Sequence, residues 1–286
     1  NMINILCTSK PGDGLFCYSY EHCHYLNSVG IPSQVVVITH PRFNQSDYLN
    51  LVKEKYITCE NIVFDDCNPS TKDVTVVMGR SMITLPYLSR HDYTSNQMLT
   101  LHLLTKSKLI SVYSENHPGT YDEALHFFKA DRVYDLCDFD VYPNGKGDQF
   151  EKMINFSIYK PIKEDIKYEH LFLGTNAVYY EEIKNHIYDE LDYAILSYNE
   201  KYIDKNLNHV FAPVKNLLGM FKNYVYTKPY FDPAPRLIQE FKWLGKNVTY
   251  LRNSKIKDGG LVYIKRPVPT EEMYRKNINI LIEKIM

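Results

Sequence analysis

The chain has 286 residues, of which 44% are hydrophobic and 23% are charged, as is usual for soluble globular proteins. Its formal net charge is -1, from 33 Lys and Arg against 34 Asp and Glu, so no overall basic excess indicates a nucleic-acid-binding protein. No apolar run reaches the roughly 18–20 residues of a membrane span, which argues against a membrane partner.

The first half alternates short apolar runs with amphipathic stretches. In chain order these predict strand Ile3–Cys7, helix Phe16–Val29, strand Gln34–Thr39, helix Tyr48–Glu54, strands Asn61–Phe64 and Val74–Met78, helix Met98–Thr105, strand Leu109–Tyr113, helix Asp122–Lys129 and strand Arg132–Tyr134. Strands that are apolar on both faces and alternate with helices predict a parallel, doubly wound sheet. Right-handed crossovers then place the βα loops along one edge of the sheet, where such sheets bind ligands.

A second α/β unit is expected after the polar stretch Tyr159–Lys167. Its predicted elements are strand Leu171–Leu173, helix Tyr179–Leu191, strand Tyr193–Leu196, helix Val214–Phe221, strand Tyr224–Tyr226, helix Pro235–Leu244 and strand Val248–Leu251. A final helix is predicted over Thr270–Met286, with acidic residues in its first turn. We therefore expect a first domain over residues 2–160, a second over 165–268 and a C-terminal helix over 269–286.

The six cysteines all lie in the first half, and none forms a CxxC pair. Cys17 and Cys23, with His22 and His24 beside the latter, have a spacing that fits no common zinc module, so no metal site is predicted there. We interpret the cysteines as reduced thiols of an intracellular protein, several of them buried. The 25 tyrosines fit either a polar binding cleft or an ordinary α/β core.

The stretch around Pro235 carries the clearest sign of a ligand site. A predicted strand leads into a proline-rich loop, and Pro235 suits the first turn of the helix that follows. A helix N-terminus at the carboxyl end of a strand favours anions, and Arg236 adds donors suited to a diphosphate. Glu240 lies one turn further on the same face, where its carboxylate can accept bonds from sugar hydroxyls. The alternative is an ordinary amphipathic helix with a core stripe of Leu237, Phe241 and Leu244.

Asp232-x7-Glu240, followed by Phe-Lys-Trp-Leu-Gly-Lys-Asn-Val, resembles the acidic-x7-Glu helix of glycosyltransferases with the GT-B fold. The segment Asp-Pro-Ala-Pro-Arg-Leu-Ile-Gln-Glu also resembles sequences in glycosyltransferases of tailed phages. The resemblance implies two Rossmann-type domains facing a central cleft, with a C-terminal helix packing back. It implies a UDP-sugar co-substrate and no tightly bound cofactor. Donor contacts would come from Lys228, Asp232, Arg236 and Glu240.

Ser107-Lys-Leu-Ile-Ser-Val-Tyr-Ser-Glu115 resembles a segment of the DNA-modifying glucosyltransferases of T-even phages. In those enzymes the strand ends in a catalytic Asp, so the resemblance makes Glu115 the candidate base, with His117 and Asp92 as rivals. An inverting transfer needs a base that removes the proton of the acceptor hydroxyl. The alternative is that Glu115 only caps the turn after the strand.

Two glycine-containing turns are weaker donor-site candidates. Leu171-Phe-Leu-Gly-Thr-Asn176 resembles the strand and turn that open the second domain in that family, so Gly174 and Thr175 would offer backbone N–H groups to a phosphate. Gly12, Asp13 and Gly14 follow the first strand and would let a sugar approach closely, although a plain tight turn explains them as well.

Other reaction classes have less support. Asp138-Phe-Asp140 is a literal DxD, which leaves a divalent metal open as an alternative for the diphosphate. No P-loop, GxGxxG, GxSxG or HExxH motif is present, which argues against NTPase, dehydrogenase, α/β-hydrolase and zincin activities.

The leading hypothesis is inverting transfer of a pentose such as arabinose, or of glucose, from a UDP-sugar to the hydroxymethyl group of modified cytosine in phage DNA. Duplex DNA would be held by basic residues, for which the candidates are Lys160, Lys163, Arg252, Lys255 and Lys257. One alternative is a glycosyltransferase for a polysaccharide, lipid or protein acceptor, and another is a non-catalytic nucleotide- or DNA-binding protein. We expect a monomer in the cytoplasm, that of the host cell for a phage-encoded enzyme.

Overall fold

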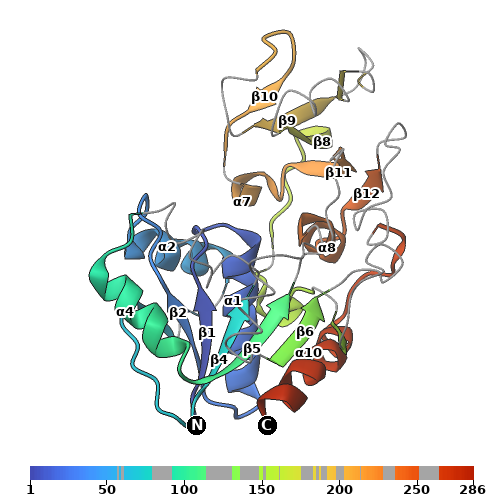
Figure 1. Cartoon of the computed structure of the whole chain (residues 1–286). Helices are drawn as coiled ribbons and strands as arrows, with labels where there is room; N and C mark the ends of the chain where they lie inside the picture. The colour runs from blue at the N-terminus through green and yellow to red at the C-terminus, as the bar shows by residue number, and fades with distance from the viewer. Residues whose placement is uncertain are drawn as a thin grey trace. The chain divides into compact units, whose positions relative to one another are not determined.

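Two units, each with its own parallel β-sheet, make up the chain (Figure 1). The first unit consists of Asn1–Tyr159 and Thr270–Met286, and the second of Lys160–Pro269. The computed structural model describes residues 1–56, 58, 61–78, 92–113, 131–135, 148–150, 153–160, 162–174, 183, 184, 187, 192–197, 203–212, 214–227, 236–250 and 264–286.

The sheet of the first unit has seven strands in the order β3-β2-β1-β4-β5-β6-β7, and every neighbouring pair is parallel. These strands are β1 (Ile3–Cys7), β2 (Ser33–Val37), β3 (Ile62–Phe64), β4 (Val74–Met78), β5 (Lys108–Tyr113), β6 (Asp131–Asp135) and β7 (Asp148–Phe150). The order reverses between β1 and β4, so the sheet is doubly wound, as predicted.

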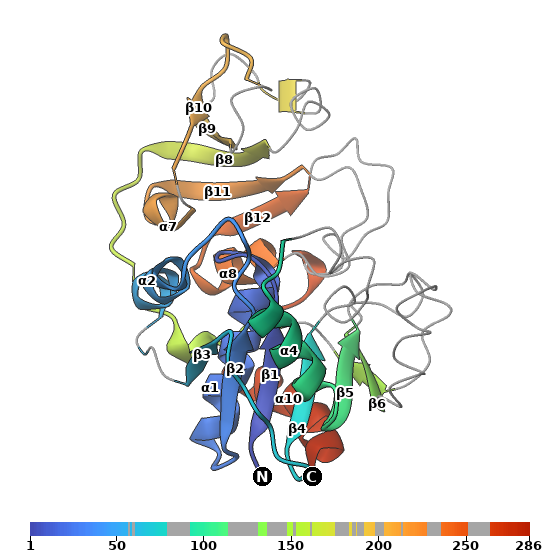
Figure 2. The ribbon, with the colours of Figure 1, turned by 60° about the vertical axis from the view of Figure 1, so that its left-hand side comes forward.

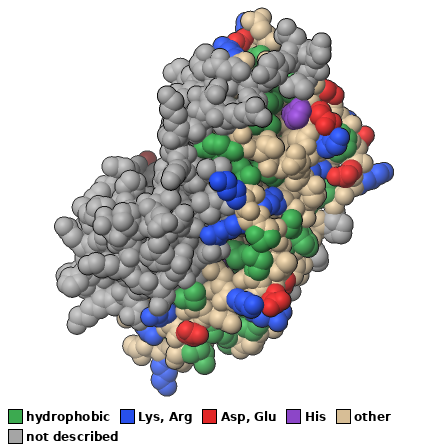
Figure 3. Space-filling model, turned by 90° about the vertical axis from the view of Figure 1, so that its right-hand side faces the viewer, with side chains coloured by type: hydrophobic (Ala, Val, Ile, Leu, Met, Phe, Trp, Pro, Cys, Tyr) green, Lys and Arg blue, Asp and Glu red, His purple; other side chains and the backbone are tan. Residues whose placement is uncertain are grey.

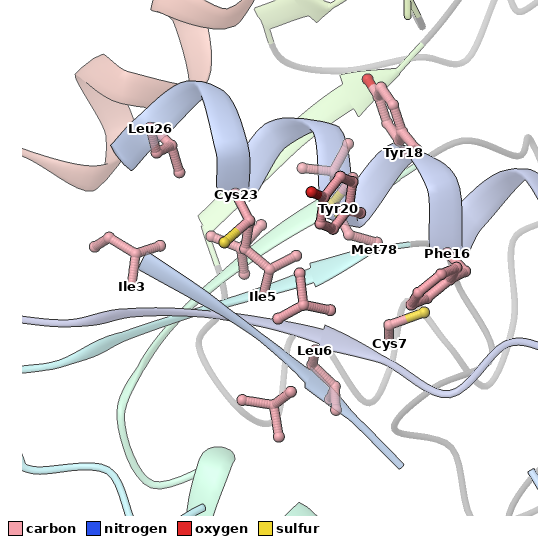
Figure 4. Packing of buried hydrophobic residues seen from close by; sticks show 14 of the residues in the cluster. Ile3, Ile5, Leu6, Cys7, Phe16, Tyr18, Tyr20, Cys23, Leu26 and Met78 are labelled. Atoms are coloured by element: carbon pink, nitrogen blue, oxygen red, sulfur yellow. The ribbon is translucent and has the colours of Figure 1, made fainter. Parts of the chain in front are cut away.

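The central strand β1 is buried on both faces because helices cover the sheet on both sides. Figure 4 shows Ile3, Ile5 and Cys7 pointing toward helix α1 (Gly14–Ser28), while Leu6 points to the opposite face. All four side chains are buried, as expected for a central strand of a parallel sheet.

The helices of the first unit begin at side-chain caps that the sequence supplies. Those in the described residues are α1, α2 (Gln45–Lys55), α4 (Ser95–Leu104), α10 (Glu271–Ile285) and a short 3-10 turn, η2 (Phe156–Ile158). Asn44 with Asp47, and Thr94 with Gln97, form complete capping boxes at the starts of α2 and α4. The chain crosses from β1 to β2 and from β4 to β5 in opposite directions, so α1 and α4 lie on opposite faces of the sheet (Figure 2).

The C-terminal helix α10 returns to the first unit, as the predicted fold class requires. Its N-cap Thr270 accepts a hydrogen bond from the Met273 backbone N–H, at 3.3 Å. Tyr274 is fully buried, and its ring meets that of Tyr25 on α1 edge to face, with 5.3 Å between the ring centroids. Helix α10 therefore completes the core of a sheet that lies far earlier in the chain.

The second unit has a five-stranded parallel sheet in the order β10-β9-β8-β11-β12. Its strands are β8 (Tyr168–Gly174), β9 (Tyr193–Ser197), β10 (His209–Val210), β11 (Phe221–Tyr226) and β12 (Asn247–Tyr250). Two helices of this unit have described bounds, α7 (Val214–Leu217) and α8 (Arg236–Trp243). The order reverses between β8 and β11, so this sheet is doubly wound as well. The predicted fold class, two Rossmann-like α/β units with the last helix packed back, is thus confirmed.

The prediction of a helix over Val214–Phe221 was wrong in its second half. Helix α7 ends at Leu217, a turn follows, and Phe221 already begins strand β11. Gly219 in this turn lies so close to the Lys163 backbone that an added Cβ would come within 2.3 Å of its carbonyl oxygen. This close approach requires a glycine at position 219, and helix α7 ends two residues before it.

Candidate functional site

The carboxyl edge of the second sheet is where a doubly wound fold is expected to bind a ligand, at the point of strand reversal between β8 and β11. Strand β8 ends there at Gly174, one of the predicted donor-site residues. The Thr227 hydroxyl, directly after β11, donates a 2.9 Å hydrogen bond to the carbonyl of Leu173. This bond joins the ends of the two strands that flank the reversal.

Helix α8 follows β11 and carries two of the predicted donor-site residues, Arg236 and Glu240. Arg236 Nε donates to Glu240 Oε1 over 2.6 Å, one helical turn apart, and the two side chains are only 10% and 3% exposed. A charge-assisted bond of this kind fixes both groups in one orientation. The structure therefore brings the guanidinium and the carboxylate together as a buried pair on one helix face.

The hydrophobic face of α8 differs from the stripe of Leu237, Phe241 and Leu244 that the sequence predicted. Ile238 and Phe241 are fully buried, whereas Leu237 and Leu244 are only partly buried. The Phe241 ring packs edge to face on Tyr224 of β11, with 4.6 Å between the centroids. The helix is thus rotated so that part of its buried surface is occupied by the pair of Arg236 and Glu240.

At the same sheet edge, the ends of β9 and β10 carry a polar pair and an exposed ring that the sequence analysis did not select. Ser197 Oγ and His209 Nδ1 are 2.9 Å apart. Burial lowers the pKa of His209, although Asp204 opposes this effect, so the environment favours the neutral imidazole. The Phe211 ring is 47% exposed and lies nearly parallel to the His209 ring, at an angle of 25° and a centroid distance of 6.5 Å.

The loop after β1 in the first unit is a tight turn that ends at a capped helix. Gly12 has a φ of 83°, in the left-handed region that favours glycine. The carboxylate of Asp13 caps α1 by accepting from the Leu15 N–H at 3.2 Å, and Gly14 is the first residue of that helix. Conformation and capping account for this turn, and its use as a donor contact stays a prediction.

Among the three candidate bases, Asp92 lies within the described residues. Its side chain is exposed, and it stands two residues before the N-cap of α4. Since α4 follows β4, Asp92 belongs to the carboxyl edge of the first sheet. The predicted site residues outside the described part of the chain are Glu115, His117, Thr175, Lys228, Asp232, Arg252, Lys255 and Lys257.

A polar network that the sequence analysis missed joins three loops at this edge. The Asp65 carboxylate accepts from the Thr39 backbone N–H at 2.7 Å, from the Thr39 hydroxyl at 2.6 Å and from Gln97 Nε2 at 2.8 Å. Asp65 itself has a φ of 55°, a left-handed conformation that Asp and Asn tolerate better than most residues. No motif marks Asp65, because its partners come from distant parts of the chain.

The predicted DNA contacts that the structure describes, Lys160 and Lys163, are both exposed. Lys246, by contrast, is buried, and its ammonium donates to Glu164 Oε1 over 2.7 Å. On the face shown in Figure 3, the basic and acidic side chains of the described residues are interspersed, with no single large basic field.

Neither a metal centre nor a reactive thiol stands out in the described residues. They contain no group of three His, Cys, Asp or Glu side chains arranged to hold a metal ion, and Asp138 and Asp140 lie outside them. Four cysteines are described, all as free thiols, and burial raises the pKa of Cys7 and Cys23 to about 11. In this same part of the chain, no helix is long and apolar enough to cross a membrane.

Several solved structures resemble this chain in fold over nearly its whole length. HepE of Anabaena in complex with UDP and glucose is 10% identical, with a TM-score of 0.56 over 99% of this chain and 90% of HepE. A UDP-N-acetylglucosamine 2-epimerase is 12% identical, with a TM-score of 0.54 over 99% and 96%. A glycosyltransferase of Rickettsia africae is 10% identical, with a TM-score of 0.50 over 99% and 94%. No protein-family model and no curated protein sequence matches the chain. At these identities the likeness establishes the GT-B fold.

Proposed function

We propose that the protein is a UDP-sugar-dependent glycosyltransferase with its donor site at the carboxyl edge of the second sheet. The observation that carries this proposal is the buried pair of Arg236 and Glu240 at the start of α8, beside the strand reversal. The N–H groups of a helix start and a fixed guanidinium suit a diphosphate, and a held carboxylate suits sugar or ribose hydroxyls. Lys228 and Asp232, in the sequence just before α8, would complete the donor contacts.

The nucleobase of the donor fits the end of β10 in this proposal. Adjacent parallel strands lie roughly 4.8 Å apart, so a nucleotide whose phosphates are at α8 can reach across the strand ends. Phe211 offers an exposed ring of the kind on which a base stacks, and the ring of the partly buried His209 lies nearly parallel to it. A UDP-sugar would then extend along one edge of a single sheet.

The reaction we propose is inverting transfer. A base removes the proton from the acceptor hydroxyl, whose oxygen attacks the anomeric carbon. The bond between that carbon and the diphosphate oxygen breaks, and UDP leaves with the electron pair. The charge that develops on the leaving diphosphate would be stabilised by Arg236 and the start of α8. Asp92, Glu115 and His117 remain the candidate bases.

For the acceptor we propose the hydroxymethyl group of modified cytosine in duplex DNA, with arabinose or glucose as the sugar. Support for a polyanionic acceptor comes from the charge distribution, since basic residues outnumber acidic ones in residues 160–269, whereas acidic residues prevail in the rest of the chain. Lys160 and Lys163 are exposed and can contact phosphates, and Arg252, Lys255 and Lys257 lie in the same basic unit by sequence. A target base in a duplex must be extruded before its hydroxymethyl group can react.

A donor panel tests the proposal. Purified protein is incubated with UDP-arabinose, UDP-glucose, UDP-xylose or UDP-N-acetylglucosamine, with and without duplex DNA that carries hydroxymethylcytosine. UDP release is recorded together with the mass of the DNA and the identity of the remaining donor. A mass gain on the DNA with one donor supports both the class and the sugar.

The other outcomes separate the parts of the proposal. UDP release without DNA modification keeps the donor site but rejects this acceptor. Conversion of the donor into an epimer, with no UDP released, would move the protein to epimerase chemistry. No response to any donor, together with no UDP binding, would overturn the transferase proposal.

A further inference from the structure

Three loops at the carboxyl edge of the first sheet are tied to Asp65. Its side chain holds Thr39 after β2 and Gln97 on α4 through the three hydrogen bonds described above. Its backbone is fixed as well: the N–H donates to the Val37 carbonyl at 2.9 Å, and the carbonyl accepts from Asn96 Nδ2 at 2.8 Å. The Thr100 hydroxyl also donates to this carbonyl, at 3.0 Å. Few conformations satisfy all of these bonds at once.

Through Gln97 the network reaches Thr94, two residues after Asp92. Besides Asp65, Gln97 Nε2 bonds the Thr39 carbonyl at 3.1 Å, while Gln97 Oε1 accepts from the Thr94 backbone N–H at 3.0 Å. Gln97 is thus both the capping-box partner of α4 and the link to the loop after β2. Tyr93, between Thr94 and Asp92, packs against the hydrophobic core. The backbone that presents the exposed Asp92 carboxylate is therefore held on its C-terminal side.

We propose that Asp65 is a positioning residue that, through Gln97, fixes Asp92 as the base at the acceptor side of the first unit. This inference rests on the proposed glycosyltransferase function and selects among its candidate bases. A residue other than glycine keeps a left-handed backbone conformation, as Asp65 does, where the surrounding bonds impose it. The position of a general base matters strongly, since a displacement of about 1 Å can cost on the order of 100-fold in rate.

The test compares two substitutions at Asp65. In Asp65→Gly the glycine adopts the φ of 55° without strain, but both carboxylate oxygens that accept hydrogen bonds are lost. Asp65→Asn also tolerates that φ, and its amide can accept from the Thr39 N–H and donate to the Thr39 hydroxyl. We expect Asp65→Gly to lower kcat by roughly 10- to 100-fold while UDP affinity is unchanged, and Asp65→Asn to stay within about threefold of wild type.

A second variant and a matched control separate positioning from stability. Gln97→Met removes the bonds of Gln97 to Asp65, to the Thr39 carbonyl and to the Thr94 N–H but leaves the bonds between Asp65 and Thr39, and it should reproduce most of the loss in kcat. Asp73 at the opposite end of the sheet accepts from the backbone N–H groups of Met2 and Ser70, both at 2.8 Å. Asp73→Ala removes a comparable acceptor, so it should lower thermal stability without changing kcat.

Combining substitutions shows what the network positions. If Asp65 acts through Asp92, the double variant Asp65→Gly with Asp92→Asn should be no slower than Asp92→Asn alone. Additive losses, or a kcat for Asp65→Gly equal to that of Asp73→Ala, would overturn this inference while an active wild type keeps the proposed function. A wild type that turns over no donor would overturn both.

Discussion

Replacing Glu240 by Gln tests whether the ion pair of Arg236 and Glu240 on α8 is as shielded from solvent as the structure indicates. Arg236 Nε and Glu240 Oε1 are 2.6 Å apart, and the side chains are 10% and 3% exposed. Removing one partner of a buried ion pair leaves the other charge uncompensated and typically costs 3–5 kcal/mol, roughly. Gln still offers one oxygen to the guanidinium, so we expect a loss of about 3 kcal/mol in the free energy of unfolding.

The assay is urea unfolding followed by circular dichroism, in which a loss of this size lowers the midpoint by about 1 M or more. The chain provides a matched control, because Lys276 and Glu272 on α10 have the same four-residue spacing at 3.2 Å but are 76% and 75% exposed. Glu272→Gln should leave the midpoint within measurement error, since exposed pairs contribute little. UDP at about 100 times its Kd should stabilise the wild type by about 2.7 kcal/mol, and Arg236→Met should lose this gain. Equal midpoints for Glu240→Gln and Glu272→Gln would refute the buried pair.

Three further predictions follow from described contacts. Phe211→Ala should weaken UDP binding by about fivefold or more, measured by calorimetry, with an unchanged Tm because the ring is 47% exposed; unchanged affinity would remove Phe211 from the donor site. Burial raises the pKa of Glu271 above its ordinary 4.5, so its contribution to stability should be full below pH 4.5 and lost as pH rises through the folded pKa. Urea unfolding across this pH range should show that slope in the wild type and not in Glu271→Gln. Gly219→Ala would place a Cβ 2.3 Å from the Lys163 carbonyl oxygen and should cost about 1–3 kcal/mol in thermal unfolding, and a smaller cost would show that the backbone yields easily.

The sequence predicts the two-sheet fold well because its central strands are apolar on both faces. Val74–Met78 is predicted with the bounds that the structure has, and all five of its residues are buried. Strand β10 escaped prediction because it has only two residues, too few for a hydrophobic pattern. Strand β11 was predicted three residues too short, with Phe221 assigned to a helix, because Lys222 and Asn223 interrupt the apolar run with polar side chains.

In the candidate site, contacts between residues close in the sequence were predictable, and contacts between distant residues were not. Arg236 and Glu240 are one helical turn apart, so a local pattern suffices to place them on one face. The network at Asp65 joins residues about thirty positions apart on either side, and no local pattern encodes which loops meet at a sheet edge. The rotation of α8 was likewise invisible, because the buried charged pair occupies surface that a hydrophobic pattern assigns to Leu237 and Leu244.

The first unit is interrupted in the chain by the whole of the second, and this affects how the protein is made. The ribosome finishes the strands of the first sheet long before it supplies α10, whose Tyr274, Ile278 and Leu281 fill part of that sheet's core. At about 5–20 residues per second, synthesis of Lys160–Pro269 takes roughly 5 to 20 seconds. During that interval the nascent first unit lacks its final helix and exposes apolar surface that chaperones can bind. Loss of the last helix should therefore impair the unit that is translated first.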